Sequence, residues 1–562
     1  MMRSKNNLLW ASFVTLVICL SCGGNDELGK KPDPPVIIDV PIDDDFQTNP
    51  QDIDTEGAVL IVFNQQSVSV TNPFEEKGVT ITHQEAHVVV QSTSSDTIRY
   101  ILTGSTLDGS LKIYSDVQYE LIMNGISIVS TDDPALNIQS HRKTTITLVD
   151  GTSNRFVGGM GFISEGGDEK IKAAFFSRGQ IVLAGAGGLT VISRYRHAIC
   201  SDNYIRITGG VITIPLSAND GLHANDYIEI NDGTIEVNAM GDGMDSEGYV
   251  LITGGSIKIT TTGDKSHGIK SETDITVQTS DDIDIHVQGD ASKAFRSKGD
   301  MLITQGNLNL TTTGDACYDD EEADISSTSG IKCRGNLVID GGHIVINSSG
   351  LGGKGISVDG TLTINDGVVA VTTTGDKYKL TDDNTKAKAI KNDEDLILNG
   401  GLIYADSKTD NALDTKGSLL MTGGTVIGIG RDLSKKGIEC KKTFKISGGT
   451  LVGIGGESSL PTASACTQYV VNYAGEVTQN AFVDIASSAG KDILTFRSPC
   501  TLSKAFILFS SSELELNMNY SIWSGGSVTG GESLYGLYSD ATYSGGTVRA
   551  TFMVSTMVMN VN

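Results

Sequence analysis

Residues 197–255 repeat one pattern three times: HAICSDNYIRITGG (197–210), DGLHANDYIEINDGTIEVNAMG (220–241) and DGMDSEGYVLITGG (242–255). Each copy carries a small residue, a large apolar residue, a short polar stretch and an alternating apolar run that reaches a Gly-rich turn. Alternation of this kind is typical of a β-strand, and a repeat of twenty to thirty residues is typical of a solenoid. The stretch therefore predicts stacked coils of short strands.

The large apolar residue of each copy, here called the anchor, extends the pattern along the chain. The gaps between successive anchors run from 22 to 36 residues. The ten anchors are Ile199, Leu222, Met244, Ile269, Phe295, Ile331, Ile356, Ile390, Leu413 and Ile438.

A glycine follows nine of the ten anchors at a fixed distance of eleven residues, and Ser280 is the exception. These glycines are Gly210, Gly233, Gly255, Gly306, Gly342, Gly367, Gly401, Gly424 and Gly449. One part of each coil is thus constant in length while the other accepts insertions. This predicts an all-β chain folded as a parallel β-helix with loops on one edge.

The composition fits such a fold and excludes one class of partner. The 562 residues include 66 Gly and only 6% aromatic residues, and the formal net charge is −26. Nucleic-acid phosphates need a basic surface, so we expect no nucleic-acid partner. An acidic chain can bind divalent cations and, through them, acidic ligands.

The N-terminus resembles an export signal. Residues 1–21 combine Arg3 and Lys5 with an apolar stretch, and Leu20-Ser21-Cys22 resembles a bacterial lipoprotein cleavage site. We expect lipid attachment at Cys22, a membrane anchor through that lipid and an outer-membrane lipoprotein exposed at the cell surface. An ordinary secretory signal with a chance cysteine is the alternative.

The rest of the chain divides by composition. Residues 22–57 are rich in Pro and Asp and predict a disordered tether. Residues 58–460 carry the coils, and residues 461–562 read as a small C-terminal β-domain with longer strands. We expect the protein to be a monomer.

Strand alternation predicts which side chains face outward. The anchor and the residue two positions later should point inward, and the residue between them outward. The outward series is Cys200, His223, Asp245, Lys270, Arg296, Lys332, Ser357, Lys391, Asp414 and Glu439. At about 4.8 Å per coil it would form a ladder roughly 43 Å long, enough for several units of a sugar polymer.

Acidic residues recur in the turns before the anchors, and they are candidate calcium ligands. Stacked carboxylates repel one another, and Ca²⁺ with its six to eight oxygen ligands relieves the repulsion. The alternative is ordinary turn chemistry, because Asp suits tight turns. We expect at least one Ca²⁺ at Asp242, Asp245, Glu247 and Asp264. The full candidate set is Asp220, Asn225, Asp226, Asp242, Asp245, Glu247, Asp264, Asp290 and Asp315.

Basic residues follow in the same outward series. Lys270, Arg296 and Lys332, with His223 beside them, are candidate ligand-binding residues, because Arg and Lys bind carboxylated sugars. Surface charge that only keeps the solenoid soluble is the alternative. The insertion 315–330 next to this series reads as a second metal loop or a disordered acidic flap.

The residues also resemble a known family. DGLHANDYIEINDGTIEV, GDGMDSEGYVLITGG, HGIKSETDITV, KGISVDGTLTI and the closing YSIWSGG and YSGGT resemble the bacterial carbohydrate-binding family typified by a clostridial β-helix protein. The resemblance implies a right-handed parallel β-helix, similar in shape to pectate lyases, that holds calcium ions. It also implies binding of polygalacturonate or a related acidic polysaccharide.

Three functions follow from these patterns. The first is a non-catalytic, calcium-bearing polysaccharide-binding lipoprotein, since no familiar catalytic motif occurs in the chain. The second is a calcium-dependent polysaccharide lyase in which Lys270 or Lys332 removes the uronate α-proton and Arg296 steadies the carboxylate. The third is an adhesin or scaffold without glycan specificity.

Overall fold

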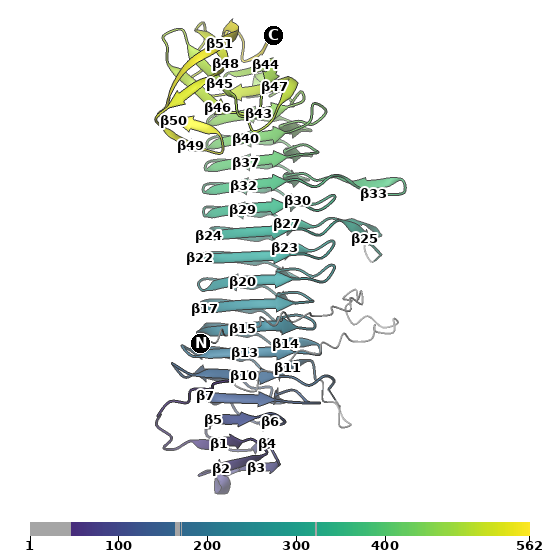
Figure 1. Cartoon of the computed structure of the whole chain (residues 1–562), viewed down its shortest axis with the longest axis vertical. Coiled ribbons are helices and arrows are strands. Elements are labelled where there is room, and N and C mark those ends of the chain that lie inside the picture. Colours follow the sequence, from purple (N-terminus) through teal and green to yellow (C-terminus); the bar gives the residue numbers. More distant parts are fainter. Residues whose placement is uncertain (1–45, 163–168, 170, 321–322) are drawn as a thin grey trace, which may run out of the picture.

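The computed structural model describes residues 46–162, 169, 171–320 and 323–562. The expected signal segment, Cys22 and most of the expected tether lie outside these residues. The described chain is an elongated solenoid of stacked strands with a small extra sheet at its C-terminal end (Figure 1). This confirms the predicted all-β parallel solenoid.

One side of the solenoid is a sheet of fifteen short strands that contains all ten anchors. Its strands are β3 (Val79–Gln84), β4 (His87–Ser92), β6 (Ser110–Ser115), β8 (Leu136–Ile138), β11 (Ala173–Ser177), β14 (His197–Ser201), β16 (Leu222–Ala224), β18 (Met244–Ser246), β21 (Ile269–Ser271), β23 (Lys293–Ser297), β27 (Ser329–Cys333), β30 (Lys354–Val358), β35 (Ile390–Asn392), β38 (Leu413–Thr415) and β41 (Ile438–Cys440). We call it the anchor sheet.

The remaining sides form one sheet of 27 strands, because its longest strands turn a corner and pair on both sides of it. β17, for example, pairs with both β19 and β20. The strands are β1 (Val59–Asn64), β2 (Ser67–Thr71), β5 (Arg99–Thr106), β7 (Tyr119–Val129), β9 (Thr144–Leu148), β10 (Ser153–Val157), β12 (Ile181–Gly185), β13 (Gly188–Ser193), β15 (Ile205–Ser217), β17 (Ile228–Ala239), β19 (Val250–Ile252), β20 (Ser256–Thr261), β22 (Ile275–Val287), β24 (Met301–Thr312), β28 (Leu337–Ile339), β29 (His343–Ser348), β31 (Leu362–Ile364), β32 (Val368–Thr373), β36 (Leu396–Leu398), β37 (Leu402–Ser407), β39 (Leu419–Met421), β40 (Thr425–Gly430), β42 (Phe444–Ile446), β43 (Thr450–Gly455), β44 (Val470–Val477), β47 (Leu502–Ser510) and β52 (Val558–Val561).

The anchors stack in register, as the repeat predicts. Ile199 pairs with Leu222, Leu222 with Met244, and the series continues without a break to Ile438. Every anchor is buried in one continuous apolar core. Burial of each such side chain contributes about 1.5–3 kcal/mol to folding.

The glycines eleven residues after the anchors mark the corner between the two other sides. Gly233 has a φ of 106°, and a Cβ there would lie 2.8 Å from the carbonyl oxygen of Gly210 in the preceding coil. Only glycine tolerates both the backbone angle and the close approach. The fixed eleven-residue spacing therefore reflects a corner that each coil turns in the same way.

Both ends of the solenoid are covered by antiparallel strands. At the N-terminal end β1 pairs with β2 and β3 with β4, joined by the short 3₁₀ helix Glu75–Lys77. At the C-terminal end, after a second 3₁₀ helix (Ala463–Ala465), β47 pairs with β43. Beyond it lies a six-stranded sheet of β45 (Phe482–Ser487), β46 (Asp492–Arg497), β48 (Asn519–Thr529), β49 (Glu532–Leu534), β50 (Leu537–Ser539) and β51 (Thr542–Met553). The pairing with β47 covers the outer edge of β43, the last long strand of the solenoid.

The prediction of a disordered tether over residues 22–57 is wrong for residues 46–53. The Gln51 N–H donates to Asn124 Oδ1 at 2.8 Å, and Asn124 Nδ2 donates back to the Gln51 carbonyl at 2.8 Å. The guanidinium carbon of Arg155 lies over the ring of Phe46, 4.4 Å from the ring centroid. Residues 46–53 thus pack against the solenoid, because a buried asparagine offers this segment backbone hydrogen bonds. Among the described residues, no helix has the length and apolarity needed to cross a membrane.

Candidate functional site

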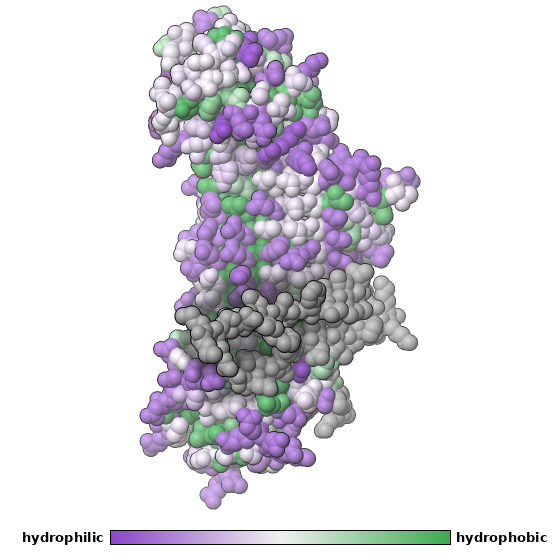
Figure 2. All heavy atoms as spheres, viewed as in Figure 1, coloured by the Kyte–Doolittle hydropathy of each residue, from purple (hydrophilic) through white to green (hydrophobic). Residues whose placement is uncertain are grey.

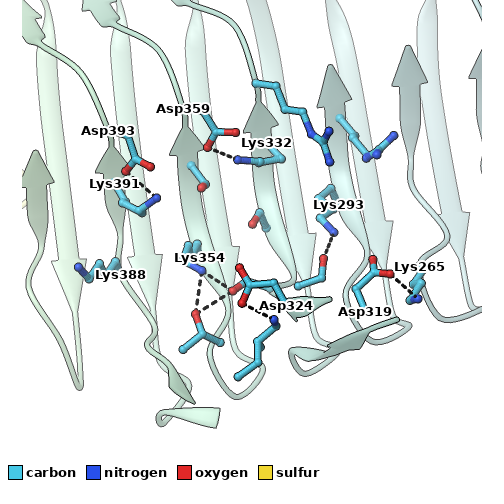
Figure 3. Close-up of a pocket in the computed structure, with 18 of the residues that line it drawn as sticks. Lys265, Lys293, Asp319, Asp324, Lys332, Lys354, Asp359, Lys388, Lys391 and Asp393 are labelled. Atoms are coloured by element: carbon cyan, nitrogen blue, oxygen red, sulfur yellow. Dashed lines mark hydrogen bonds and ion pairs between the residues drawn. The ribbon is translucent and has the colours of Figure 1, made fainter. Parts of the chain in front are cut away.

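A cleft of about 870 Å³ lies on the outer side of the anchor sheet (Figure 3). Twelve lysines and arginines line it, against six aspartates and glutamates. The whole chain carries a net charge of −26. Basic side chains are therefore concentrated in this cleft, where they create a local positive potential.

Two columns of side chains form the floor of the cleft. One is the outward series predicted from the sequence, which contributes Lys270, Arg296, Lys332, Ser357 and Lys391. The other comes from the residue two positions before each anchor, and it contributes His267, Lys293, Ser329, Lys354 and Lys388. Five coils at about 4.8 Å make this basic floor roughly 19 Å long.

The second column was missed because the predicted alternation breaks at the residue just before each anchor. That residue faces the core: Ala294 is part of the core, and a Cβ on Gly268 would lie 2.3 Å from Ile285 Cγ2. The residue before it therefore turns outward. The visible signal is a glycine or alanine at all ten positions: Ala198, Gly221, Gly243, Gly268, Ala294, Gly330, Gly355, Ala389, Ala412 and Gly437.

Lys293 has no carboxylate partner among the described residues. Its Nζ donates to the Ala291 carbonyl at 2.6 Å and to Ser326 Oγ at 2.8 Å. Burial, and then the positive charges of Arg296 and Lys332, lower the pKa of Lys293 to about 7. This amine therefore gains and loses its charge near neutral pH.

Lys354 is held in a similar way. It donates to Thr385 Oγ1 at 3.0 Å and to the hydroxyl of Ser327. Burial, and then the charges of Lys391 and Lys332, lower its pKa to about 7. In the part of the chain that the structure describes, Lys354 likewise has no carboxylate partner.

Two inserted hairpins wall the cleft along one edge, and they protrude from the solenoid in Figure 1. They consist of β25 (Cys317–Asp319) with β26 (Asp324–Ser326), and β33 (Tyr378–Leu380) with β34 (Asp383–Thr385). Ser327 Oγ and Thr385 Oγ1 lie 3.0 Å apart, so the two insertions meet. The described residues of the 315–330 insertion thus form a hairpin and a wall of the cleft, so the expectation of a disordered flap is wrong for them.

The predicted ligand-binding residues reach this region, each with an acidic partner. Arg296 Nη1 lies 3.5 Å from Glu272 Oε1, and Lys332 is paired with Asp359. Lys270 Nζ lies 3.3 Å from Asp242 Oδ2. The structure thus brings Lys270, Arg296 and Lys332 into one cleft, and places His223 in an acidic cluster beyond its end.

The acidic cluster contains Asp220, Asp242 and Asp245, whose carboxylates lie within 4.8 Å of one another. His223 Nδ1 lies 3.5 Å from Asp220 Oδ2 and 3.3 Å from Asp245 Oδ2. Lys270 Nζ lies 3.1 Å from Asp245 Oδ1. Protein cations therefore sit between the stacked carboxylates.

Burial and charge together set the protonation of this cluster. Burial raises the pKa of Asp242 to about 7, with Lys270 opposing and the neighbouring Asp245 and Asp220 adding to the rise. Burial disfavours the charged form of His223, yet Asp220 and Asp245 raise its pKa to about 10. Asp242 and Asp245 likewise hold the pKa of Lys270 above its usual range, against the effect of burial.

The other candidate metal ligands do not join the cluster. Glu247 and Asp226 are exposed, and Asn225 is half-buried. Asp264, Asp290 and Asp315 form a turn ladder in which each Oδ1 accepts a backbone N–H from the next coil at 2.7–2.8 Å. The expected four-residue set of Asp242, Asp245, Glu247 and Asp264 is therefore not assembled, because Glu247 points to solvent and Asp264 belongs to the ladder.

The donors around Asp220 are a poor match for calcium. Ca²⁺ takes six to eight oxygen ligands, whereas two imidazole nitrogens and the Lys270 ammonium crowd these three carboxylates. The three side chains of the turn ladder, Asp264, Asp290 and Asp315, are all carboxylates. Burial raises the pKa of Asp290, and the charges of Asp264 and Asp315 add to the rise, so the predicted repulsion between stacked carboxylates exists there.

The predicted outward ladder is not continuous. Cys200, at one end, is fully buried in a separate small cluster with Ala173 and Phe176. At the other end Asp414 pairs with Lys388, and Glu439 with Lys436 and Lys441. The surface available to a ligand is therefore the basic middle of the ladder. The face shown in Figure 2 is largely hydrophilic, with only small apolar patches between the polar side chains.

Comparison with known proteins gives consistent matches. A family model described as carbohydrate-binding domain-containing protein matches residues 84–376 and 262–432, which together span more than half of the chain. A carbohydrate-binding domain-containing protein of Acetivibrio thermocellus is 27% identical over 217 residues, which cover 38% of this chain and 66% of that protein. A solved structure of a polysaccharide lyase-like protein from C. thermocellum, a gadolinium derivative, is 27% identical. It covers 45% of this chain and 99% of its own length with a TM-score of 0.40. On the extent of the family match, the chain belongs to the family of carbohydrate-binding domain-containing proteins.

Proposed function

We propose that this protein binds an acidic polysaccharide along the basic cleft and does not cleave it. The observation that carries the proposal is the excess of twelve basic over six acidic residues in the cleft of a chain with a net charge of −26. Membership of a carbohydrate-binding family supports a polysaccharide as the ligand. An acidic polymer is the class whose charge matches the cleft.

The repeat suits a polymer better than a small ligand. The floor presents a basic side chain on each of five successive coils, so successive charged sugars can meet equivalent side chains. Arg296 can hold a carboxylate through two hydrogen bonds, and the lysines act as point charges. The ion pairs of Arg296 and Lys332 must open, so the sugar carboxylates would replace Glu272 and Asp359 as partners.

Affinity electrophoresis in gels that contain polygalacturonate tests the proposal. We expect retardation that weakens with added salt, and none in a gel with the fully methyl-esterified polymer. The double variant Lys332→Met, Lys391→Met should lose most of the retardation. Lys258→Met is the matched control, because Lys258 lies on β20, outside the cleft, with its side chain 65% exposed. Equal retardation by the charged and the esterified polymer would overturn the proposal.

A lyase is the second candidate, and Lys293 and Lys354 are the observation that favours it. A general base works best with a pKa near the working pH, and both amines meet that condition. Lys270, the base first expected, is held protonated by Asp242 and Asp245. Ultraviolet absorbance of unsaturated products after incubation with polygalacturonate would establish cleavage, and its loss in Lys293→Met or Lys354→Met would identify the base.

The remaining expectations concern metal and location. We propose Ca²⁺ at the Asp264, Asp290 and Asp315 ladder, supported by the raised pKa of Asp290. We also propose lipid attachment at Cys22, display at the outer-membrane surface and a monomeric state. Labelling with a fatty-acid analogue, compared between the native chain and Cys22→Ser, tests the lipid. Protease treatment of intact cells tests the orientation, and light scattering tests the monomer.

A further inference from the structure

Two histidines from successive coils stack against each other in the acidic cluster. The rings of His197 and His223 have centroids 4.6 Å apart and planes inclined by 19°. Their Nδ1 atoms lie 3.0 and 3.5 Å from the same oxygen, Oδ2 of Asp220. The three donor atoms all lie within 4.8 Å of one another.

The Nδ1 atoms of both imidazoles face the Asp220 carboxylate without a well-aligned hydrogen bond. Both Nδ1 atoms are buried, and within the described part of the chain neither meets hydrogen-bond geometry, although a carboxylate oxygen lies within 3.5 Å of each. A buried polar atom without a partner costs about 1–3 kcal/mol. Two such nitrogens turned toward one carboxylate oxygen form a donor set that suits a metal ion, which would take the place of the proton that His223 otherwise carries.

The surrounding groups hold the carboxylates in place. Oδ1 of Asp220 accepts the backbone N–H of Asp242 at 2.7 Å, which leaves Oδ2 for the histidines. Asp245 uses Oδ1 for Lys270 and directs Oδ2 to His223 at 3.3 Å. Outer partners of this kind orient the ligands of a metal site.

We propose that His197, Asp220 and His223 bind a divalent transition metal ion such as Zn²⁺, with Asp245 as the adjacent counter-charge. Zn–N and Zn–O bonds of about 2.0–2.2 Å place neighbouring tetrahedral ligands roughly 3.4 Å apart. The observed separations of 3.0 and 3.5 Å are close to that value. Imidazole nitrogen selects zinc and its neighbours over calcium, which prefers oxygen.

Three protein ligands leave one tetrahedral position open, as in zinc sites that bind a water or a ligand. The ion would join strand β14 to the turn before β16 and to β16 itself, just beyond the basic floor of the cleft. The site does not depend on polysaccharide binding, so its test is independent of the proposed function.

Isothermal titration of chelator-treated full chain with Zn²⁺, and separately with Ca²⁺, tests the site. We expect one equivalent of Zn²⁺, a rise in the thermal midpoint on addition of Zn²⁺, and loss of both effects in His197→Ala, His223→Ala. His267→Gln is the matched control, because His267 occupies the same column one coil beyond Asp242 and its Nδ1 accepts the Lys293 N–H at 3.1 Å.

X-ray absorption of the zinc-loaded native chain gives a second readout that needs no variant. It should show two imidazole nitrogens and oxygen ligands on zinc. Absence of Zn²⁺ binding, full binding in the folded double variant, or a zinc shell without imidazole would each overturn the proposal.

Discussion

Lys270 reaches back one coil to Asp245, where its Nζ lies 3.1 Å from Oδ1. It also lies 3.3 Å from Asp242, and all three side chains are at most 16% exposed. The chain thus provides from its own sequence a cation between stacked carboxylates, where calcium was expected.

Replacing this lysine should therefore destabilise the solenoid. Lys270→Met leaves two buried carboxylates without their cation, and we expect a loss of about 3 kcal/mol in the free energy of unfolding. Chemical denaturation measures it, and Lys258→Met should change stability by less than about 0.5 kcal/mol. Similar effects of the two variants would show that the buried pair contributes nothing. Adding Asp245→Asn to Lys270→Met should recover part of the loss.

Binding of an acidic polymer should strengthen as the pH falls through 7. Lys293 and Lys354, both with a pKa of about 7, are largely neutral at pH 8 and charged at pH 6. Two added charges in the cleft should tighten binding by about tenfold. Retention on polygalacturonate at constant ionic strength measures the change.

The double variant Lys293→Met, Lys354→Met is the control for this pH dependence. It should bind nearly equally at pH 6 and pH 8, because the two cleft lysines that titrate in this interval are gone. An unchanged pH profile in the folded variant would assign the effect to other groups.

Calcium should stabilise the chain through the turn ladder. Burial and the neighbouring Asp264 and Asp315 make the ionised form of Asp290 unfavourable, and a divalent cation would remove that cost. We expect millimolar Ca²⁺ to raise the thermal midpoint of the native chain but not that of Asp290→Asn. Mg²⁺ at the same concentration controls for ionic strength. Equal calcium shifts in both proteins would place the ion elsewhere.

Asp484 in the C-terminal sheet should make stability depend on pH. It is fully buried, Thr495 Oγ1 donates to its Oδ1 at 2.7 Å, and Oδ2 has no hydrogen-bond partner among the residues that the structure describes. Burial raises its pKa to about 7, Thr495 opposes the rise, and Asp492 adds to it. The native state therefore binds the proton more tightly than the unfolded chain, so this residue's contribution falls between about pH 4 and pH 7.

Asp484→Asn removes the free-energy cost of ionising a buried carboxylate. It should stabilise the protein at pH 8, on the order of 2 kcal/mol, and leave stability at pH 4 nearly unchanged. Thermal unfolding at the two pH values measures the difference. A gain of equal size at both would show that Asp484 does not titrate on unfolding.

The repeat was enough to predict the coils. The ten anchors of the repeat pair one to one in the structure, because a buried large apolar side chain must stack on its equivalent in the next coil. The Gly233 corner was equally visible, since its backbone angle and close contact admit no other residue. A large apolar side chain and a corner glycine are needed in nearly every coil, so both recur in the sequence at regular spacing.

The site was less accessible from the sequence. Strand parity placed Lys270 and Arg296 outward but not Lys293 or Lys354, because the chain bends at the small residue before each anchor. The partners of Lys270 lie 25 and 28 residues earlier, and their contact depends on side-chain conformation rather than on period. The stacking of His197 on His223 likewise depends on how two successive coils lie on each other, which the sequence does not show.

The two hairpins sit on coils whose anchors are 36 and 34 residues apart, yet Phe295 still pairs with Ile331 and Ile356 with Ile390. Residues inserted at that edge therefore leave the packing of the core unchanged. Natural variation or engineering can exchange one hairpin for another and so reshape the wall of the cleft at no cost to the stacking beneath it. Ligand preference in such a chain can change one coil at a time.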